Sequence, residues 1–238
     1  MRIAIIGYGK MGHEIEKLAL ERNHQIVLRI DENNVKSITK QDFENVDLAI
    51  EFSKPESAFF NINMCFDNHI PVVSGTTGWL DNFDKLIERC TNEKQTFFYA
   101  SNYSIGVNMF FKINTQLANM MNQHQDYEVS IEETHHIQKI DAPSGTAISL
   151  ANGIIENIDR KIKWEKEAES SKDSVSVYSF REGSVPGNHK VIYESPFDKI
   201  MIEHDAKSRK GFALGAILAA EFIVHKKGFY TMNDLLKF

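Results

Sequence analysis

Residues 2–12 read RIAIIGYGKMG, a short apolar run that leads directly into three glycines. The run is typical of a buried strand, and the glycines fit G-x-G-x-x-G, a pattern found between a strand and a helix in dinucleotide-binding folds. Glycines permit a tight turn there, so that N–H groups at the helix start can meet a pyrophosphate. The residues predicted to bind a dinucleotide are Gly7, Tyr8, Gly9, Lys10, Met11 and Gly12.

Short β-rich runs alternate with helical patterns from this loop to about residue 100. Strands are expected at 2–7, 25–31, 46–53, 71–76 and 96–100, and helices at about 11–22, 55–68 and 82–91. This alternation is typical of a parallel sheet covered by helices. The first part of the chain is therefore predicted to have an α/β fold.

Asp31 ends the second expected strand, about 20 residues after Gly12. A carboxylate at this place would accept hydrogen bonds from the adenosine ribose hydroxyls. Glu32 adds a second negative charge that a 2′-phosphate would meet, so the sequence favours NADH over NADPH. Arg29 and Lys10 are close enough in sequence to oppose this preference.

Two polar turns follow the fourth and fifth expected strands. Ligands of open α/β sheets bind at the carboxyl ends of strands, which makes both turns candidates for nucleotide contacts. Glycine, serine and asparagine are also ordinary turn residues, so a purely structural role is an equal alternative. The candidate residues are Gly75, Thr76 and Thr77, and then Ala100, Ser101, Asn102 and Tyr103.

The pattern changes after Asn102, which suggests a second module. Helices are expected at about 107–121 and 144–158, with strands at 127–134, 174–180, 189–195 and 199–205. Apolar residues recur at period two in the last three strands, which favours an antiparallel sheet with one covered face. The charge-dense segment 159–173 is predicted to be a solvated surface loop, with a functional patch as the alternative. Residues 211–225 are predicted to form a buried helix that returns to the first module and is followed by a short tail.

The stretch THHIQKIDAPSGT, residues 134–146, carries the candidate chemistry. His135 and Lys139 are four apart and share one side in a strand or in a helix. An imidazole beside a protonated amine resembles a general acid with an electrostatic anchor. His136 would face the other way in a strand, so a metal site shared by both histidines is disfavoured.

The segment Asp141–Thr146 has the features of a helix start, with Pro143 in its first turn. N–H groups at such a start can hold a carboxylate or a phosphate. The residues alone therefore propose a nicotinamide enzyme that reduces a small anionic substrate, with protonation by His135. A solvated strand end is the alternative for the histidines. His189 and His204 are left undecided, and the other histidines are assigned to surface or packing.

Composition limits the possible partners and compartments. The chain has 238 residues, 42% hydrophobic, and a net charge of -6, which disfavours nonspecific binding to nucleic acid or anionic membranes. Cys65 and Cys90 lie far apart in helical segments, so neither a disulfide nor a metal site is expected. No run reaches membrane-spanning length, and the initial apolar run lacks a cleavage sequence. A cytoplasmic location is therefore expected.

Five segments of the chain resemble the 4-hydroxy-tetrahydrodipicolinate reductase family, also called dihydrodipicolinate reductases. The most specific is THHIQKIDAPSGTA at 134–147; the others are GYGKMG at 7–12, GTTG at 75–78, ASNYSIGVN at 100–108 and SRKGFALGA at 208–216. The resemblance implies reduction of a small cyclic dicarboxylate in diaminopimelate and lysine biosynthesis, with hydride from NADH or NADPH entering at C4 of the ring. It also implies a Rossmann-type parallel sheet domain (1–104 and 209–238), an inserted α+β domain with an open mixed sheet (105–208), and a homotetramer.

The family roles carry over to matching positions of this chain. The resemblance implies that His135 donates a proton, while Lys139 assists protonation and binds the dicarboxylate. His136 would contact the substrate, and Gly145 and Thr146 would bind a carboxylate at the helix start. The implied nucleotide contacts are the residues already named at 7–12, 31, 75–77 and 100–103. The glycine loop departs from the common family pattern G-x-x-G-x-M-G, and no metal is implied.

Two other functions stay open at this point. One is a dehydrogenase of similar two-domain build that acts on an amino or keto dicarboxylate such as aspartate. The other is a nucleotide-binding sensor without catalysis. Intact His135 and Lys139 speak against the sensor, because a pure binder does not need an acid.

Overall fold

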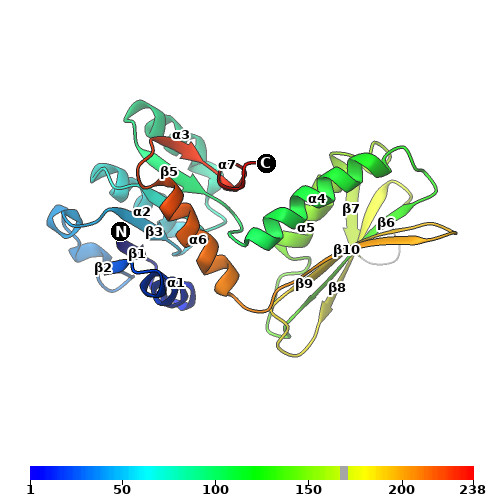
Figure 1. Cartoon of the computed structure of the whole chain (residues 1–238), viewed down its shortest axis with the longest axis horizontal. Coiled ribbons are helices and arrows are strands. Elements are labelled where there is room, and N and C mark those ends of the chain that lie inside the picture. The colour runs from blue at the N-terminus through cyan, green and yellow to red at the C-terminus, as the bar shows by residue number, and fades with distance from the viewer. Residues whose placement is uncertain (167–170) are drawn as a thin grey trace. The chain divides into compact units, whose positions relative to one another are not determined.

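The computed structural model describes residues 1–166 and 171–238 and divides into two compact units (Figure 1). One unit comprises Met1–Ile105 and Arg209–Phe238, and the other comprises Gly106–Ser208. No helix among the described residues combines the length and apolar character that a membrane span needs.

A six-stranded sheet forms the centre of the first unit, and all its strands are parallel. In spatial order the strands are β11 (Gly228–Tyr230), β5 (Thr96–Tyr99), β4 (Val72–Ser74), β3 (Leu48–Glu51), β1 (Arg2–Ile6) and β2 (Gln25–Ile30). The chain leaves β1 toward β2 on one side and returns to β3 on the other. The strand order thus reverses beside β1, the point at which open α/β sheets bind ligands.

Helices cover both faces of this sheet because its central strands are apolar on both faces. Ile3 and Ile5 of β1 face α1 and α6, whereas Ala4 and Ile6 face α2 and α3. The helices of this unit are α1 (Lys10–Glu21), α2 (Pro55–Asp67), α3 (Phe83–Asn92), α6 (Lys210–Ile223) and α7 (Met232–Leu236), with short 3-10 helices η1 (Val35–Ser37), η2 (Lys40–Phe43) and η3 (Leu80–Asn82). The α/β fold with a Rossmann-type sheet is confirmed.

The second unit is a five-stranded mixed sheet with two helices on one face. In spatial order its strands are β10 (Lys199–Asp205), β9 (Asn188–Glu194), β6 (Glu128–His135), β8 (Ser174–Arg181) and β7 (Lys163–Lys166). The covering helices are α4 (Ile105–Met121) and α5 (Gly145–Ile155).

The antiparallel arrangement expected from the period-two pattern is wrong for part of this sheet. β9 pairs antiparallel with β6 and β10, but β8 runs parallel to both β6 and β7. Helix α5 carries the chain from the end of β6 back to the level at which β6 began, so that β7, which follows it, runs in the same direction as β6. Alternation along a strand reports its covered face and not the direction of its neighbour.

Two segments expected to be irregular contain regular structure. The segment 159–173, predicted to be a surface loop, includes β7, in which the Trp164 ring packs on the apolar core. Charged side chains are well tolerated on such an edge strand, which explains the misleading composition. Residues 167–170 of that prediction lie outside the described residues. The expected short tail holds β11 and α7.

Candidate active site

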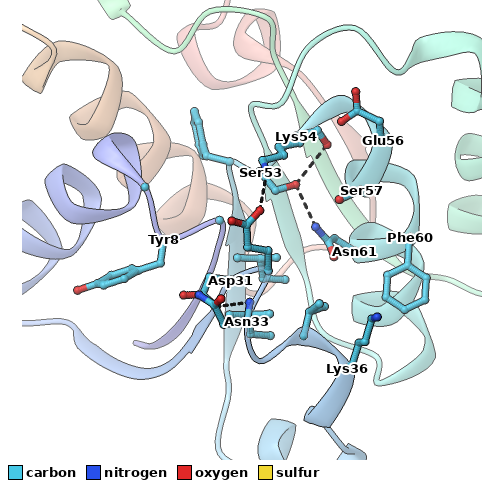
Figure 2. Close-up of a pocket in the computed structure, with 17 residues that line it drawn as sticks. Tyr8, Asp31, Asn33, Lys36, Ser53, Lys54, Glu56, Ser57, Phe60 and Asn61 are labelled. Carbon is cyan, nitrogen blue, oxygen red and sulfur yellow. Dashed lines mark hydrogen bonds and ion pairs between the residues drawn. The ribbon is translucent and has the colours of Figure 1, made fainter.

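A cleft of about 840 Å³ opens at the carboxyl ends of β1, β2 and β3 in the first unit (Figure 2). Its lining includes Gly7, Tyr8, Gly9 and Asp31. A second hollow of about 480 Å³ shares Gly9 with the cleft, and its lining includes Lys10, Met11, Gly75, Thr76 and Thr77. The structure thus gathers two of the three loops expected to contact a nucleotide at the place where the strand order reverses.

The glycine loop is shaped by close backbone contacts. Gly7 has a φ of 92°, and a Cβ there would lie 2.1 Å from the Phe52 carbonyl oxygen. Gly12 lets α1 approach β1, since its Cβ would lie 2.6 Å from the Gly7 carbonyl oxygen. A Cβ on Gly9, the N-cap of α1, would meet nothing within 4 Å, and no side chain caps this helix end. The loop therefore presents helix N–H groups to an open space, which suits a pyrophosphate.

Asp31 is fixed at the edge of the cleft by its own loop. Its carboxylate accepts hydrogen bonds from the main-chain N–H groups of Asn33, at 2.8 Å, and Asn34, at 3.3 Å. The Arg29 guanidinium, which could have offset this charge, is paired with Glu16 and lies over the Tyr8 ring. Its hydrogen bonds to Glu16 raise the pKa of Arg29, so the cation is held in that pair.

Glu51, the last residue of β3, is a fully buried acidic residue that the sequence analysis did not single out. It accepts hydrogen bonds from the Ser53 N–H at 3.0 Å, the Ser74 hydroxyl at 2.6 Å and the Thr76 hydroxyl at 2.8 Å. It thereby ties the loop after β3 to the loop after β4. Glu51 could have been singled out from the sequence, because an acidic residue that ends an otherwise apolar, buried strand needs hydrogen-bond donors around it.

The third expected nucleotide loop, residues 100–103, lines neither hollow. The Tyr103 ring is 2% exposed, and its hydroxyl donates to the Ser74 carbonyl oxygen at 2.7 Å. Its side chain is therefore part of the core. The Asn102 carboxamide accepts a hydrogen bond from the Ser104 N–H at 2.9 Å, which shapes the turn before α4.

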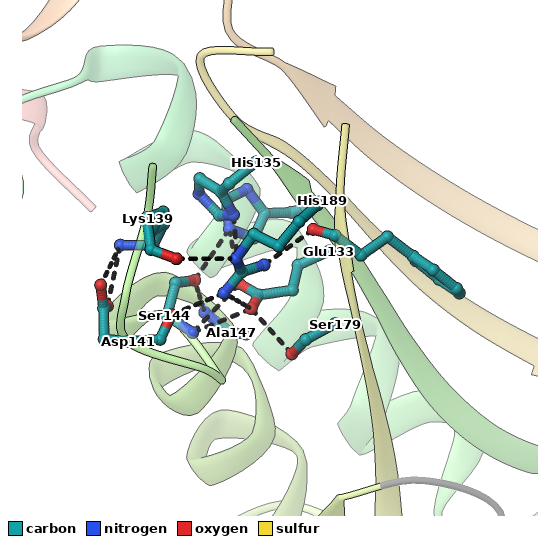
Figure 3. Close-up of polar contacts among 10 residues, drawn as sticks. Glu133, His135, Lys139, Asp141, Ser144, Ala147, Ser179 and His189 are labelled. Atoms are coloured by element: carbon teal, nitrogen blue, oxygen red, sulfur yellow. Dashed lines mark hydrogen bonds and ion pairs between the residues drawn. The ribbon is translucent and has the colours of Figure 1, made fainter. Parts of the chain in front are cut away.

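A polar cluster stands at the carboxyl end of β6 in the second unit (Figure 3). Residues at alternate positions of this strand face α4 and α5; the first two are Val129 and Ile131, and the next two are Glu133 and His135. The covered face thus changes from apolar to ionisable along one strand. Glu133 could have been singled out from the sequence, because it is a charged residue at one of the alternate strand positions that are expected to be buried.

Strand register completes this cluster. Glu133 lies opposite His189 of β9 and Ser179 of β8, and His189 lies opposite His204 of β10. His189 and His204, which were undecided, therefore join one row across the sheet. The His204 ring stacks on Phe110 at a centroid distance of 6.2 Å, which gives it a packing role.

Glu133 has no exposed surface and many donors around it. The Ser144 N–H approaches its two oxygens at 3.0 and 3.1 Å, and the Ser179 hydroxyl donates at 2.8 Å. Burial alone would raise the pKa of Glu133, but the His189 ring 3.7 Å away and the hydrogen bonds from Ser144 and Ser179 outweigh it and lower the pKa to about 2. The group is therefore a carboxylate at neutral pH.

His135 ends β6 beside this carboxylate. Its Nδ1 lies 3.5 Å from Glu133 Oε2, and its ring lies 5.0 Å from the His189 ring, centroid to centroid. Burial lowers the pKa of His135 to about 4, helped by His189, Lys139 and Arg181, while Glu133 acts in the opposite direction. Without a bound anion His135 is therefore neutral at pH 7.

Lys139 lies in the loop after β6, and its ammonium group contacts both Asp141 carboxylate oxygens at 2.8 Å. The Arg181 side chain holds this loop by donating to the carbonyl oxygens of Lys139, at 3.2 Å, and Asp141. The premise that placed His135 and Lys139 on one side is wrong, because β6 ends at His135 and a turn follows. His136 lies after the end of β6, so the argument that it would face away from His135 in a strand no longer applies. Lys139 nonetheless acts electrostatically on His135, which supports a shared site.

Helix α5 begins next to Glu133. Ser144 is its N-cap, with the hydroxyl oxygen accepting from the Ala147 N–H at 3.2 Å. Pro143 precedes the cap, so the expectation that it lies in the first turn is wrong. Helices prefer serine at the N-cap, because its hydroxyl oxygen accepts a hydrogen bond from an N–H of the first turn, and proline has no side-chain oxygen to do so. The Ser144 N–H is already held by Glu133, which leaves the first-turn N–H groups of Gly145 and Thr146 for an anion.

The residue types in this cluster, one carboxylate and two imidazoles, could also bind a metal ion. One donor atom each from Glu133, His135 and His189 lie within 4.8 Å of one another, close enough for a shared ion. The carboxylate, however, already accepts from Ser144 and Ser179 and lies 3.6 Å from the Arg181 guanidinium. These contacts favour a hydrogen-bonded anion over a metal ligand.

Comparison with known proteins gives matches along nearly the whole chain. Residues 1–103 match the family model described as dihydrodipicolinate reductase, N-terminus, and residues 106–236 match the one described as dihydrodipicolinate reductase, C-terminus.

Relatives of known name agree with these models. The 4-hydroxy-tetrahydrodipicolinate reductase of Christiangramia forsetii is 51% identical over 236 residues, covering 99% of this chain and 98% of the relative. That of Staphylococcus epidermidis is 34% identical over 246 residues, covering 99% and 100%. A solved structure, dipicolinate-bound dihydrodipicolinate reductase from Paenisporosarcina sp. TG-14, has the same fold, with a TM-score of 0.81, 22% identity and 98% of each chain covered. The chain therefore belongs to the dihydrodipicolinate reductase family, as its motifs predicted.

Proposed function

We propose that this protein reduces 4-hydroxy-tetrahydrodipicolinate to tetrahydrodipicolinate with NADH or NADPH, in the biosynthesis of diaminopimelate and lysine. Family membership supports the reaction, and the observation that carries the site is the cluster at the end of β6, where His135 and Lys139 stand near the start of α5. The nicotinamide, when bound, would supply a hydride to C4 of the ring after water has left.

Two features of the second unit suit a ring that bears two carboxylates. The first-turn N–H groups of Gly145 and Thr146 lie at the positive end of the α5 dipole and would hold one carboxylate. Lys139 would bind the dicarboxylate in exchange for Asp141, an ion pair that is exposed enough to open. His136, just beyond the strand end, would add a substrate contact, and His135 would supply the proton.

Proton supply sets a condition on substrate binding. His135 has a pKa of about 4 without substrate, below the ordinary value for histidine, so it must gain a proton before it can donate one. A dicarboxylate nearby stabilises the imidazolium and raises that pKa. The complex then binds more protons than the free protein, so affinity should fall as the pH rises through the pKa of the complex.

We therefore expect dipicolinate, a dicarboxylate analogue, to bind with uptake of roughly half a proton or more per site between about pH 5 and 6. Titration calorimetry in two buffers of different ionisation enthalpy measures this number. The variant His135→Gln is the control, and its uptake should be close to zero. Binding of dipicolinate without proton uptake by the native protein would contradict the role of His135.

For the cofactor, we propose a preference for NADH that rests on Asp31. Its carboxylate is fixed by the N–H groups of its own loop, and Arg29 is neutralised by Glu16, so a 2′-phosphate would meet a negative edge. The wider nucleotide contacts proposed are Gly7, Tyr8, Gly9, Lys10, Met11 and Gly12, then Gly75, Thr76 and Thr77, and then Ala100, Ser101, Asn102 and Tyr103, the last through its backbone.

We expect kcat/KM to be higher for NADH than for NADPH. Asp31→Ala should lower kcat/KM for NADH roughly tenfold, because the proposed hydrogen bonds from the adenosine ribose hydroxyls to the Asp31 carboxylate are lost. Glu32→Ala is the matched control, since this neighbour is paired with Lys54. A preference for NADPH above tenfold in the native enzyme would contradict the assignment of Asp31.

The proposal includes a homotetramer in the cytoplasm. Phe180 of β8 and Met201 of β10 are about half exposed on the face of the mixed sheet that points away from α4 and α5. Apolar side chains on an open sheet face favour burial against other subunits. The mass in solution, measured by light scattering, tests the assembly.

A direct assay tests the function. Freshly made condensation product of pyruvate and aspartate semialdehyde is supplied with NADH, and the absorbance of NADH is followed. Substrate-dependent oxidation is expected; no consumption with fresh substrate would contradict the proposal. Turnover that requires ammonia would instead indicate a dehydrogenase of an amino or keto dicarboxylate, and nucleotide binding without any turnover would indicate a sensor.

A further inference from the structure

Glu133 lies next to three groups of the proposed substrate site: the start of α5, the His135 ring and the Arg181 side chain. Its carboxylate holds the Ser144 N–H at the start of α5, lies 3.5 Å from His135 Nδ1, and lies 3.6 Å from the Arg181 guanidinium. Arg181 in turn holds the loop that carries Lys139. One buried anion therefore connects the proton donor, the carboxylate cradle and the cationic loop.

The two ring nitrogens of His135 have different surroundings. Nδ1 is buried and makes no hydrogen bond to the described residues, but the Glu133 carboxylate lies 3.5 Å from it. Nε2 lies toward Gly187, where a Cβ would be only 3.2 Å away, so the missing side chain leaves room beside this nitrogen. A carboxylate near one nitrogen of an imidazole stabilises the tautomer that carries the proton there and leaves the other nitrogen to react.

We propose that Glu133 is a positioning residue for the reductase reaction: it keeps a proton on His135 Nδ1, so that Nε2 is the atom that takes up and delivers the transferred proton. The inference rests on the proposed function. Glu133 does not touch the substrate in this scheme. It acts by orienting the imidazole and stabilising the imidazolium, as a carboxylate does behind a catalytic histidine.

The charges around the ring give the sign of the effect on pH dependence. Facing His135 are His189 of β9, Arg181 of β8, Lys139 of the following loop and Glu133 of β6, and only Glu133 favours the charged ring. Removing its charge therefore makes His135 harder to protonate. Because the reaction needs protonated His135, the decline of kcat with rising pH should move to lower pH.

The first experiment uses the native protein and needs no turnover. Nitrogen-15 NMR of labelled histidine gives the tautomer of His135 at neutral pH, with His135→Gln used to assign its signals. The Nδ1–H tautomer is expected. The Nε2–H tautomer would overturn the proposal, whether or not the protein is a reductase, so this result is independent of the function assay.

The second experiment compares Glu133→Gln with Glu132→Gln. Glu132 is the neighbour on the other face of β6, is partly exposed, and is only loosely paired with Lys190, so its variant controls for the loss of one negative charge on the same strand. We expect Glu133→Gln to lower kcat roughly tenfold to a hundredfold, with a larger loss at pH 8 than at pH 6 and a smaller change in KM. The control should stay within about twofold.

Several results would overturn the proposal. One is a folded Glu133→Gln variant with an unshifted pH profile, and another is a variant that changes KM alone. If Glu133→Gln does not fold, the NMR result on the native protein decides. The rival use of the cluster is tested with zinc: tight stoichiometric Zn²⁺ binding that is abolished in both Glu133→Gln and His189→Gln would make it a metal site.

Discussion

Replacing His135 by alanine is expected to lower kcat roughly a hundredfold or more, and replacing Lys139 by alanine should have an effect of similar size. In the proposed mechanism, loss of His135 removes the proton donor, so kcat should fall while KM changes little. In the same mechanism, loss of Lys139 removes a positive charge proposed to bind the dicarboxylate and to favour proton transfer, so KM should rise as well. Steady-state kinetics with NADH and fresh substrate measures both constants.

The same loop supplies a matched control for these variants. Gln138 lies between the two residues in sequence, and its side chain is exposed. Gln138→Ala should keep kcat within about twofold of the native value, because surface substitutions away from a site have small effects. Losses below threefold for both His135→Ala and Lys139→Ala would remove these residues from the mechanism.

Features that depend on neighbours in sequence were predictable. The strand, glycine loop and helix at residues 2–21 form one local unit, and the loop geometry follows from glycines at positions where a side chain would collide. The stretch 134–146 was also recognised as chemically unusual. His135 and Lys139 were grouped for a reason that the turn after β6 invalidates, although their electrostatic interaction supports the grouping itself.

Features that depend on strand register were missed. His189 lies more than fifty residues from Glu133 along the chain, and only the pairing of β6 with β9 brings them together. Nothing in a single sequence gives that register, because period two identifies a strand's buried face without identifying its partner. Glu51 was missed for a similar reason, since its donors come from the ends of two different strands.

Replacing Gly7 by alanine is expected to destabilise the first unit by about 3 kcal/mol or more and to abolish nucleotide binding. The φ of 92° is unfavourable for alanine, and the new Cβ would lie 2.1 Å from the Phe52 carbonyl oxygen. That oxygen belongs to main chain that is tied through Ser53 to Glu51, so the loop cannot simply move aside. Calorimetry should record a fall in Tm of roughly 10 °C.

Gly9→Ala separates this steric effect from the effect on the ligand. A Cβ on Gly9 meets nothing within 4 Å, so the variant should keep its Tm within about 2 °C. The same methyl group would stand where the loop faces the open hollow, so NADH binding should weaken roughly tenfold or more by crowding of the pyrophosphate. If Gly9→Ala instead binds NADH as tightly as the native protein, the pyrophosphate does not lie against this loop. If Gly7→Ala keeps the native Tm, then Phe52 and Ser53 can shift, and the close contact is not what requires glycine at this position.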